Sequence, residues 1–427
     1  MMEEVVKYLY EIPRFARTGG LCQTQERLRL LGNPEKSFHY IHVAGTNGKG
    51  SVCAYMEAAL RRMGFKTGLF TSPHLIRINE RIRIGNEEIS DEAFIRAFHR
   101  VKELIDRQMD EGIPHPTFFE FIYLMAMCAF EEAGIAYGVI ETGLGGRLDL
   151  TNAVEKPDLT VITSISLDHT AILGDTVEKI ASEKAGIIKP HVPLVYLART
   201  NSVSHVIEDQ ARSQESPVFP VRTEWIQDVC VREGRLSFAY QCPYFEKYDI
   251  ILNTGGIYQA ENASLALTGL KVMFGDRFRD SILAGIESMQ WAGRMEPVAQ
   301  NVYVDGAHND DGIQKLVASV NMAFSGKDIY LVFAVAEDKD YQEMARHLSQ
   351  IRGLKGVIVT EINNGRRRDF HEVMEDFKKN WHGIIQGTYN VSEAIVTGQE
   401  WKGQDGILIC TGSLYLVGHV KEILGGI

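Results

Sequence analysis

Hydrophobic positions between about residues 38 and 200 follow two alternating periods. Short apolar runs predict strands, and between them apolar residues recur every three or four positions, which predicts helices. The stretch 91–110, for example, carries Phe94, Phe98, Val101 and Ile105 on one helical face. The predicted strands are His39–Val43, Thr67–Phe70, Ala136–Ile140, Leu159–Ile162 and Val192–Tyr196, with helices at 49–63, 91–110, 117–133 and 175–186. Such alternation predicts βαβ units and a mainly parallel sheet.

The pattern changes character between residues 216 and 251. Short β-prone pieces there predict a small antiparallel insertion, and helical periodicity returns over 258–273 and 282–289. The pieces are Pro217–Val221, Val229–Arg232, Leu236–Gln241 and Tyr248–Leu252.

A second α/β run begins near residue 300. Its predicted strands are Val302–Val304, Ile329–Val335, Gly356–Thr360 and Gly406–Cys410, with helices near 310–323, 340–350, 368–379, 391–398 and 413–424. We therefore predict a hinge near Gln290–Pro297 that joins a domain of residues 1–293 to a smaller one of residues 294–427.

Length and composition agree with two domains in an ordinary globular protein. A chain of 427 residues is longer than one typical domain with a single hydrophobic core. Of its residues 45% are hydrophobic and 24% charged. The net charge of -11 argues against an extended nucleic-acid surface. The six cysteines form no CxxC pair, which favours free thiols. No signal peptide or long apolar span is evident, so we expect a cytoplasmic monomer without nucleic-acid or membrane partners.

A glycine-rich loop follows the first strand and opens an amphipathic helix. Glycines let backbone N–H groups approach phosphate oxygens, and the start of a helix favours an anion. A lysine there reaches the terminal phosphates, and a hydroxyl meets a phosphate or its Mg²⁺. The spacing departs from the ordinary Walker pattern, because Gly45 and Gly48 are separated by two residues rather than four. The loop reads Gly45, Thr46, Asn47, Gly48, Lys49, Gly50 and Ser51. We predict an α/β fold whose P-loop domain, with its antiparallel insertion, precedes a Rossmann-like domain.

Three further loops begin where predicted strands end, on the edge at which ligands bind in open α/β sheets. Ser72 follows the second strand, Glu141 the third and His169 the fourth. A carboxylate near phosphates suits a hard cation such as Mg²⁺. Each residue also has a structural reading: Ser72 as a helix cap, Glu141 as the partner of an arginine, and His169 as a turn histidine.

Lys184, Arg294, Asp305 and Asn309 are open to two readings as well. Lys184 is either an ion-paired surface lysine or, among acidic groups and metal, a lysine that CO₂ carbamylates. Arg294 at the hinge suits phosphate as a planar fork, or it joins the domains through an ion pair. Asp305 and Asn309 follow a strand of the second domain and either contact a ligand or form a turn and cap the next helix.

The ordered motifs resemble the Mur ligase superfamily and, within it, folylpolyglutamate synthase / dihydrofolate synthase. They run from residue 40 to about 418 and read GTNGKGS, TSPHL, ETGLGGRLD-TN, SLDHT-ILG-T, EKAGI-K, GR-E, DGAHN and GSLYLVG. The resemblance implies an ATP-dependent ligase that activates a folate or pteroate carboxylate as an acyl phosphate, which the amino group of L-glutamate then attacks. It also implies two Mg²⁺ ions, with a monovalent cation as a further candidate.

The resemblance assigns roles to residues by motif. Lys49, Lys184 and His169 fall on catalytic positions, and the loop from Gly45 to Ser51 falls on the ATP phosphates. Asn262, Arg294 and Asp305 fall on nucleotide-contacting positions; Ser72, Glu141, His169 and a carbamylated Lys184 on metal positions; and Arg77, Arg147, Asp149, His308 and Ser413 on substrate positions. The loop around Arg147 is similar to that of members that also accept dihydropteroate.

Two other functions stay open on the sequence. A cell-wall ligase that extends a nucleotide-sugar precursor carries an additional N-terminal domain, whereas here the phosphate loop begins by residue 45. A P-loop nucleotidase without ligase activity explains the loop but not the set of Glu141, His169 and Lys184. Phosphate release that depends on glutamate and a pterin distinguishes the three functions.

Overall fold

A computed structural model describes residues 1–13, 20–337, 339–362 and 368–425 of the protein. The chain forms two compact units, each described by itself. Unit 1 comprises Met1–Ile226, Cys242–Tyr244 and Glu261–Met289; unit 2 comprises Gln227–Gln241, Phe245–Ala260 and Gln290–Ile427.

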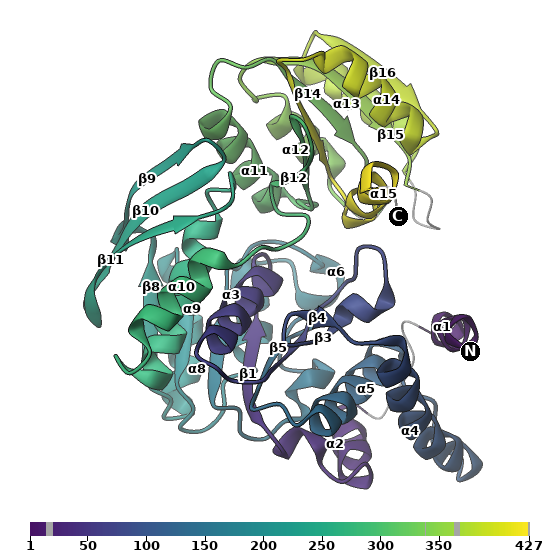
Figure 1. Ribbon diagram of the computed structural model, residues 1–427, viewed down its shortest axis with the longest axis vertical. Coiled ribbons are helices and arrows are strands. Elements are labelled where there is room, and N and C mark those ends of the chain that lie inside the picture. The colour runs from purple at the N-terminus through teal and green to yellow at the C-terminus, as the bar shows by residue number, and fades with distance from the viewer. Residues whose placement is uncertain (14–19, 338, 363–367, 426–427) are drawn as a thin grey trace. The chain divides into compact units, whose positions relative to one another are not determined.

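Unit 1 is built on an eight-stranded sheet of order β4-β3-β2-β5-β1-β6-β7-β8 (Figure 1). From β2 to β8 neighbouring strands are parallel, and β3 and β4 pair antiparallel at one edge. The strands are β1 (His39–Ala44), β2 (Thr67–Phe70), β3 (Ile82–Ile84), β4 (Glu87–Glu88), β5 (Tyr137–Glu141), β6 (Leu159–Ile162), β7 (Leu194–Ala198) and β8 (Val218–Arg222). Every residue of β2, β5, β6 and β7 is buried, as expected for parallel strands covered on both faces.

Helices cover both faces of this sheet. The side chain of Ile162 packs with α7 and α8, whereas Leu159 and Val161, which point the other way along β6, lie against α9 and α3. The longer helices are α1 (Met2–Glu11), α2 (Gly20–Leu30), α3 (Lys49–Arg62), α4 (Asp91–Asp110), α5 (Phe118–Ala133), α7 (Val177–Ala185), α8 (Asn201–Ser213), α9 (Gln259–Phe274) and α10 (Arg279–Ser288). Short helices are η1 (Pro34–Lys36), η2 (Ile78–Arg81), η3 (Leu150–Ala153), α6 (Thr170–Leu173) and η4 (Thr223–Trp225).

The periodicity located the main elements of unit 1 to within a few residues. It missed α1, α2 and α8, and it misplaced one strand. The pattern predicts Pro217–Val221 in the antiparallel insertion, but β8 pairs parallel with β7 at the edge of the large sheet. A short apolar run looks the same in either sheet, because only its partner strand decides where it belongs.

The predicted insertion is a separate three-stranded sheet of order β11-β10-β9. Its strands are β9 (Ile226–Arg232), β10 (Arg235–Cys242) and β11 (Phe245–Leu252). Only short turns join neighbours that pair, so the strands run antiparallel, as predicted.

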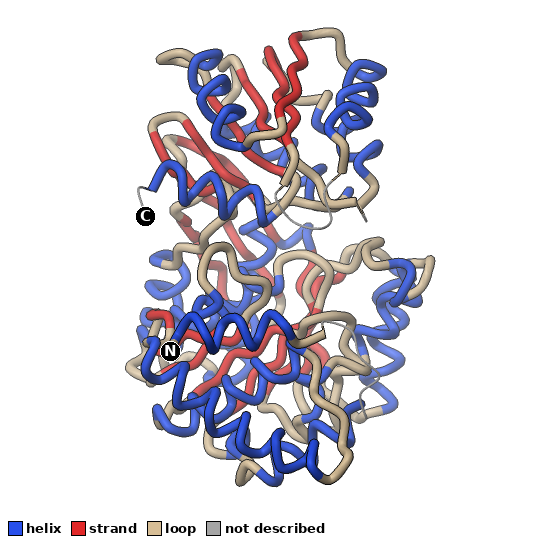
Figure 2. The backbone as a smooth tube through the Cα atoms, turned by 90° about the vertical axis from the view of Figure 1, so that its right-hand side faces the viewer, coloured by secondary structure: helices blue, strands red, loops and turns tan. Residues whose placement is uncertain are grey.

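Unit 2 also contains a six-stranded sheet of order β12-β13-β17-β14-β15-β16, in which only β12 runs antiparallel. The strands are β12 (Glu296–Ala299), β13 (Val302–Asp305), β14 (Ile329–Phe333), β15 (Leu354–Thr360), β16 (Ile384–Thr388) and β17 (Ile407–Thr411). The helices are α11 (Asp310–Ala323), α12 (Tyr341–Leu348), α13 (Phe370–Asn380), α14 (Val391–Lys402) and α15 (Leu414–Gly425). They lie beside the strands in Figure 2. The mixed α/β fold with a smaller second α/β sheet is thus confirmed.

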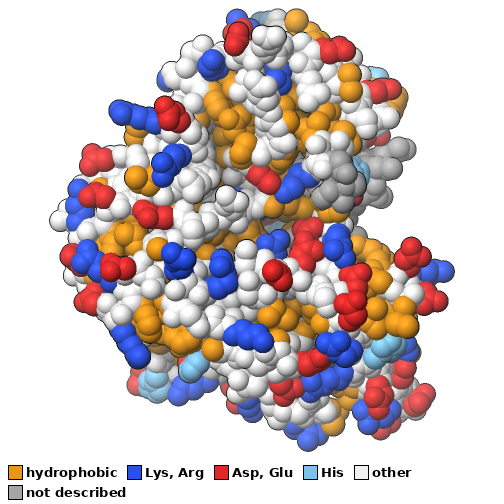
Figure 3. Space-filling view, in the orientation of Figure 1, with side chains coloured by type: hydrophobic (Ala, Val, Ile, Leu, Met, Phe, Trp, Pro, Cys, Tyr) orange, Lys and Arg blue, Asp and Glu red, His pale blue; other side chains and the backbone are white. Residues whose placement is uncertain are grey.

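The surface and the cysteines match the composition. On the face shown in Figure 3, Lys and Arg side chains are interspersed with Asp and Glu side chains, so its charge is mixed. All six cysteines are free; Cys22 is exposed and Cys230 partly exposed. Within the described residues, no helix combines the length and apolarity that a membrane span requires.

Candidate active site

The phosphate loop joins the buried end of β1 to the start of α3, where the sequence placed it. Gly48 caps α3 with φ of 88°, in the left-handed region that glycine adopts without strain. Gly48 has no side chain with which to cap this helix, so the capping residue itself uses none of its first N–H groups. Lys49 begins α3, and Ser51 is buried in its first turn. The backbone geometry is that of an anion site at a helix N-terminus.

The residues that directly follow β6 are hydrogen-bonded to this loop. Thr46 donates its N–H to the Ser164 carbonyl at 2.7 Å, and the Thr163 hydroxyl donates to the Asn47 carbonyl at 2.7 Å. A Cβ on Gly45 would lie only 1.7 Å from Thr163 Oγ1. Thr163 and Ser164 were missed as supports, although their position directly after a strand next to β1 was a usable signal.

Lys49, Glu141 and Ser72 converge because β2, β5 and β1 are neighbours in register. Val43 pairs with Glu141, and Phe70 pairs with Ile140. Glu141 is buried, accepts the N–H of Ser72 at 3.0 Å, and places Oε1 3.9 Å from Lys49 Nζ. The Lys49 ammonium also donates to the Thr46 carbonyl at 3.1 Å.

Lys184 is directly connected to the phosphate loop. It lies near the end of α7, is only 3% exposed, and donates from Nζ to the Gly45 carbonyl at 2.6 Å. Burial and the nearby Lys49 charge lower the pKa of Lys184 to about 7, against the opposing effect of Asp168 and Asp149. The reading as an ion-paired surface lysine is therefore wrong. A buried amine with this pKa is neutral in a large fraction of molecules at neutral pH.

His169 lies at the start of α6 in the left-handed conformation, with φ of 50°. Its backbone N–H is bonded to Asp168 Oδ1 at 2.9 Å, and its side chain is 42% exposed with Nε2 3.9 Å from the same oxygen. The histidine is therefore a loop residue rather than a core residue.

The turn that carries Arg147 and Asp149 is fastened to α7. Arg147 donates its N–H to the Glu183 carbonyl and its guanidinium to Glu183 Oε1, both at 2.6 Å. Asp149 is buried and accepts from the N–H of Leu144 at 2.7 Å and from the hydroxyl of Thr151 at 2.5 Å. Burial raises the pKa of Asp149, and these hydrogen bonds oppose the rise.

Two other predicted residues of unit 1 have polar or close contacts. Arg77 is about half exposed and donates to Asp91 Oδ1 at 2.7 Å. Asn262 is buried on α9, and a Cβ on Gly48 would lie 2.3 Å from its Oδ1. Asn262 therefore borders the phosphate loop. The sequence pattern does not reveal this proximity, because more than 200 positions separate Asn262 from the loop along the chain.

In unit 2, Asp305 is the centre of a buried turn at the end of β13. Its Oδ2 accepts the Tyr258 hydroxyl at 2.5 Å and the Met295 N–H at 3.0 Å, and its Oδ1 accepts the Ala307 N–H at 2.9 Å. Burial raises the pKa of Asp305, and the charge of Arg294 opposes it. Asp305 therefore forms a turn, as its structural alternative predicts, and Tyr258 is a partner that the sequence did not reveal.

His308 and Ser413 follow two neighbouring strands, since Asp305 of β13 pairs with Thr411 of β17. The His308 ring donates from Nδ1 to the Gly306 carbonyl at 2.8 Å, which leaves Nε2 as the ring's acceptor when it is neutral. Ser413 is buried, and its Oγ accepts the Tyr415 N–H at 3.2 Å. Asn309 caps α11 by accepting the N–H of Gly312, as its structural reading held.

The oxygen atoms of Ser72 and Glu141 fit a hard divalent cation. A serine hydroxyl and a buried carboxylate at adjacent strand ends are ligands that Mg²⁺ accepts together with phosphate oxygens and water. An unmodified Lys184 does not fit, because an amine hydrogen-bonded to a carbonyl carries no oxygen.

Comparison with protein families gives two matches. The Mur ligase middle domain matches residues 43–269, and the Mur ligase glutamate ligase domain matches residues 293–414. The dihydrofolate synthase/folylpolyglutamate synthase of Bacillus subtilis (strain 168) is 33% identical over 430 residues, which cover 96% of each chain. The chain belongs to the Mur ligase family, in its folylpolyglutamate synthase/dihydrofolate synthase branch. It is an ATP-dependent ligase.

Solved structures of this branch share the fold. The folylpolyglutamate synthase of Thermotoga maritima is 32% identical with a TM-score of 0.85, covering 99% of this chain and 96% of its own. The Mycobacterium tuberculosis folylpolyglutamate synthase complexed with ADP is 28% identical with a TM-score of 0.91, covering 99% and 98%.

Proposed function

We propose that this Mur ligase family member adds L-glutamate to reduced folates, and to dihydropteroate, while ATP is converted to ADP and phosphate. The observation that carries the proposal is sequence similarity along nearly the whole chain. The dihydrofolate synthase/folylpolyglutamate synthase of B. subtilis aligns over 96% of both proteins. A cell-wall ligase or a nucleotidase without ligase activity lacks such support.

The reaction joins a carboxylate to an amine, and the carboxylate must first react with ATP, which repels it. A carboxylate oxygen of the folate or pteroate attacks the γ-phosphorus of ATP, and ADP leaves. The glutamate nitrogen then attacks the acyl carbon, phosphate leaves, and the amine loses a proton. The first step brings an anion to a polyanion, so positive charge and alignment must supply most of the catalysis.

In this proposal the phosphate loop and Lys49 hold the ATP phosphates. The N–H groups from Gly45 to Ser51 and the α3 terminus favour the negative charge, and the Lys49 ammonium lies 3.1 Å from the Thr46 carbonyl of the same loop. Ser72, Glu141 and His169 hold Mg²⁺, which when bound screens the phosphate charge. Asn262 beside Gly48 borders the nucleotide.

Lys184 is proposed to act as a carbamate. Its neutral amine attacks the carbon of CO₂ and loses a proton, which yields an anionic group with two oxygens. Burial supports this role, because the amine lies within a hydrogen bond of the phosphate loop and the cost of its charge favours the neutral, nucleophilic form. The carbamate would offer Mg²⁺ the oxygen ligands that the unmodified amine lacks.

The remaining roles are proposed from the motifs. Arg294 and Asp305 contact the nucleotide, His308 and Ser413 place glutamate, and Arg77, Arg147 and Asp149 bind the pterin substrate; the domain boundary is proposed at residues 293 and 294. Burial of Asp305 and Asp149 in full hydrogen-bond sets supports a role in shaping their loops. A monomeric cytoplasmic enzyme remains our expectation.

Release of ADP tests the proposal when it is measured with each acceptor, with and without L-glutamate. Tetrahydrofolate, dihydropteroate and a uridine-linked sugar peptide serve as acceptors at equal concentration. We expect glutamate-dependent ADP release and a product heavier by one glutamate residue with the first two. Turnover only with the sugar peptide would establish the cell-wall function, and release that needs neither acceptor nor glutamate would establish a nucleotidase.

A further inference from the structure

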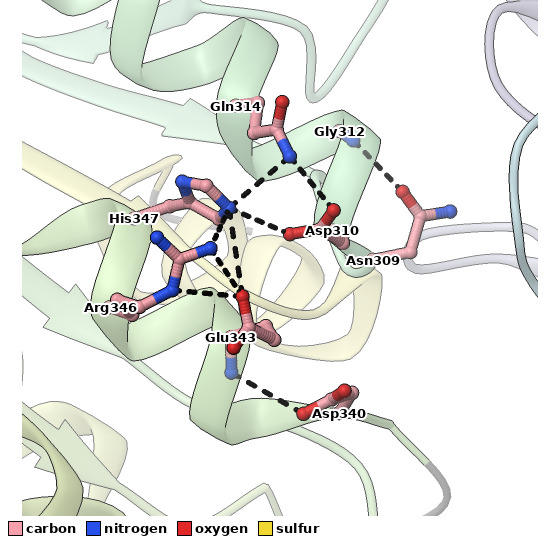
Figure 4. A network of polar contacts seen from close by, with 8 residues as sticks. All are labelled: Asn309, Asp310, Gly312, Gln314, Asp340, Glu343, Arg346 and His347. Carbon is pink, nitrogen blue, oxygen red and sulfur yellow. Dashed lines mark hydrogen bonds and ion pairs between the residues drawn. The ribbon is translucent and has the colours of Figure 1, made fainter.

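A histidine and two carboxylates converge on the surface of unit 2, outside the motifs described above. Asp310 begins α11, and Glu343 and His347 lie one turn apart on α12 (Figure 4). In the part of the chain that the structure describes, this is the one His, Cys, Asp or Glu trio whose candidate ligand atoms all lie within 4.8 Å of one another. His347 is 13% exposed, and both carboxylates are 46% exposed.

The hydrogen bonds show which atom of His347 faces the cluster. The amide nitrogen of Gln314 at 3.2 Å and a guanidinium nitrogen of Arg346 at 3.0 Å both lie against Nε2. Both are nitrogen donors without a lone pair, so the tautomer that satisfies both contacts has Nε2 as its accepting nitrogen. That is also the form in which histidine binds a metal ion.

Asp310 Oδ1 lies 3.0 Å from this nitrogen, yet it is hidden from solvent and has no hydrogen-bond partner among the described residues. In that tautomer two lone-pair atoms, Nε2 of His347 and Oδ1 of Asp310, face each other at this distance. Ligands about 2.0–2.2 Å from one tetrahedral zinc ion lie roughly 3.3–3.6 Å apart, so a small outward shift of this pair would make room for a shared cation. Glu343 Oε2 is 4.0 Å from Nε2 and needs only a small side-chain rotation to join them.

We propose that Asp310, Glu343 and His347 form a site for a divalent first-row metal ion such as Zn²⁺. An imidazole with two carboxylates is a ligand set of this class, and it would tie α11 to α12. Two cationic features oppose binding. The N-terminus of α11 carries about half a positive charge, less than the two carboxylates together. Arg346 bonds Glu343 Oε2 but is 45% exposed, so its side chain can turn into solvent.

A variant of Arg346 distinguishes a metal site from a simple network of ion pairs. His347→Gln and Glu343→Gln remove ligands, and even loss of a metal's outer partners weakens affinity about 10- to 100-fold. Arg346→Gln removes a competing cation and should tighten binding about two- to five-fold, because exposed ion pairs are weak. His371→Gln is the matched control, since among the described residues His371 pairs with a single carboxylate, that of Asp369, at 2.9 Å.

Zn²⁺ titration calorimetry on the full chain in a large excess of Mg²⁺ tests the proposal, with circular dichroism to confirm folding. We expect wild type and H371Q to bind one more equivalent than H347Q and E343Q, and R346Q to bind it more tightly. Equal stoichiometry and affinity in wild type, H347Q and E343Q would overturn the site, as would loss of binding in R346Q. Neither result bears on the proposed ligase activity, because the cluster shares no residue with it.

Discussion

Replacement of Lys184 by methionine should stabilise the protein while it removes activity. Methionine keeps the length and apolar stem of lysine but carries no charge. Lys184 is 3% exposed, and its pKa is about 7 in place of 10.5. Wild type therefore loses stability by burying an amine that the unfolded chain holds protonated.

The magnitude follows from the two pKa values. The difference of about 3.5 pH units corresponds to about 5 kcal/mol when the unfolded amine is fully charged and the folded one stays protonated. Between pH 7 and 10.5 the unfolded chain binds more protons at this amine than the folded chain, so stability rises with pH through that window. The destabilisation is therefore about 4 kcal/mol at pH 7 and about 2 kcal/mol at pH 9. Loss of the bond to the Gly45 carbonyl costs the variant about 1–3 kcal/mol. K184M should therefore be more stable than wild type by about 1–3 kcal/mol at pH 7 and nearly equal to it at pH 9.

Urea unfolding followed by circular dichroism at pH 7, 8 and 9, in buffer freed of CO₂, measures this difference. Lys179→Met on the same helix is the control, because Lys179 is 62% exposed and pairs with Asp175 at the surface. Its difference from wild type should stay within about 1 kcal/mol and not vary with pH. The reasoning is refuted if K184M is the less stable protein at pH 7, or if its difference from wild type is the same at pH 7 and pH 9.

Three further predictions concern the phosphate loop and the residues around it. Lys49→Ala and Glu141→Ala should fold normally but lower glutamate-dependent ADP release at least about 100-fold, because each removes charge stabilisation at the phosphates; near-wild-type turnover in either contradicts the phosphate and metal roles. Lys184→Ala should abolish ligation, and added acetate or propionate should partly restore it; full activity without them rules out the carbamate. Gly48→Ala should weaken binding of an ATP analogue in calorimetry and lower stability by about 1 kcal/mol or more, because φ is 88° and the new Cβ would meet Asn262 Oδ1 at 2.3 Å; unchanged affinity would mean that the loop tolerates a side chain there.

Local pattern was sufficient for most of the elements and for the order of the motifs. A strand buried on both faces followed by glycines and a lysine specifies a phosphate loop, because few other sequences provide this backbone geometry. Parallel order then brought Ser72 and Glu141 to one edge, as the strand ends predicted. The amphipathic period also placed α11 and α12 almost to the residue.

Burial and partners were decided by the tertiary structure. A lysine such as Lys184 looks like a surface residue in the sequence, and only packing on the Gly45 carbonyl removes its water and shifts its pKa. The same holds for Asn262 beside Gly48 and for the strand at Val218–Arg222, whose sheet was misassigned. Hydrophobic period and turn chemistry act over a few residues, so the sequence alone determined most of the elements and the nucleotide loop. Desolvation and contacts between distant segments exist only once the chain is packed, and these set the charge state of Lys184 and the convergence of Asp310 with His347.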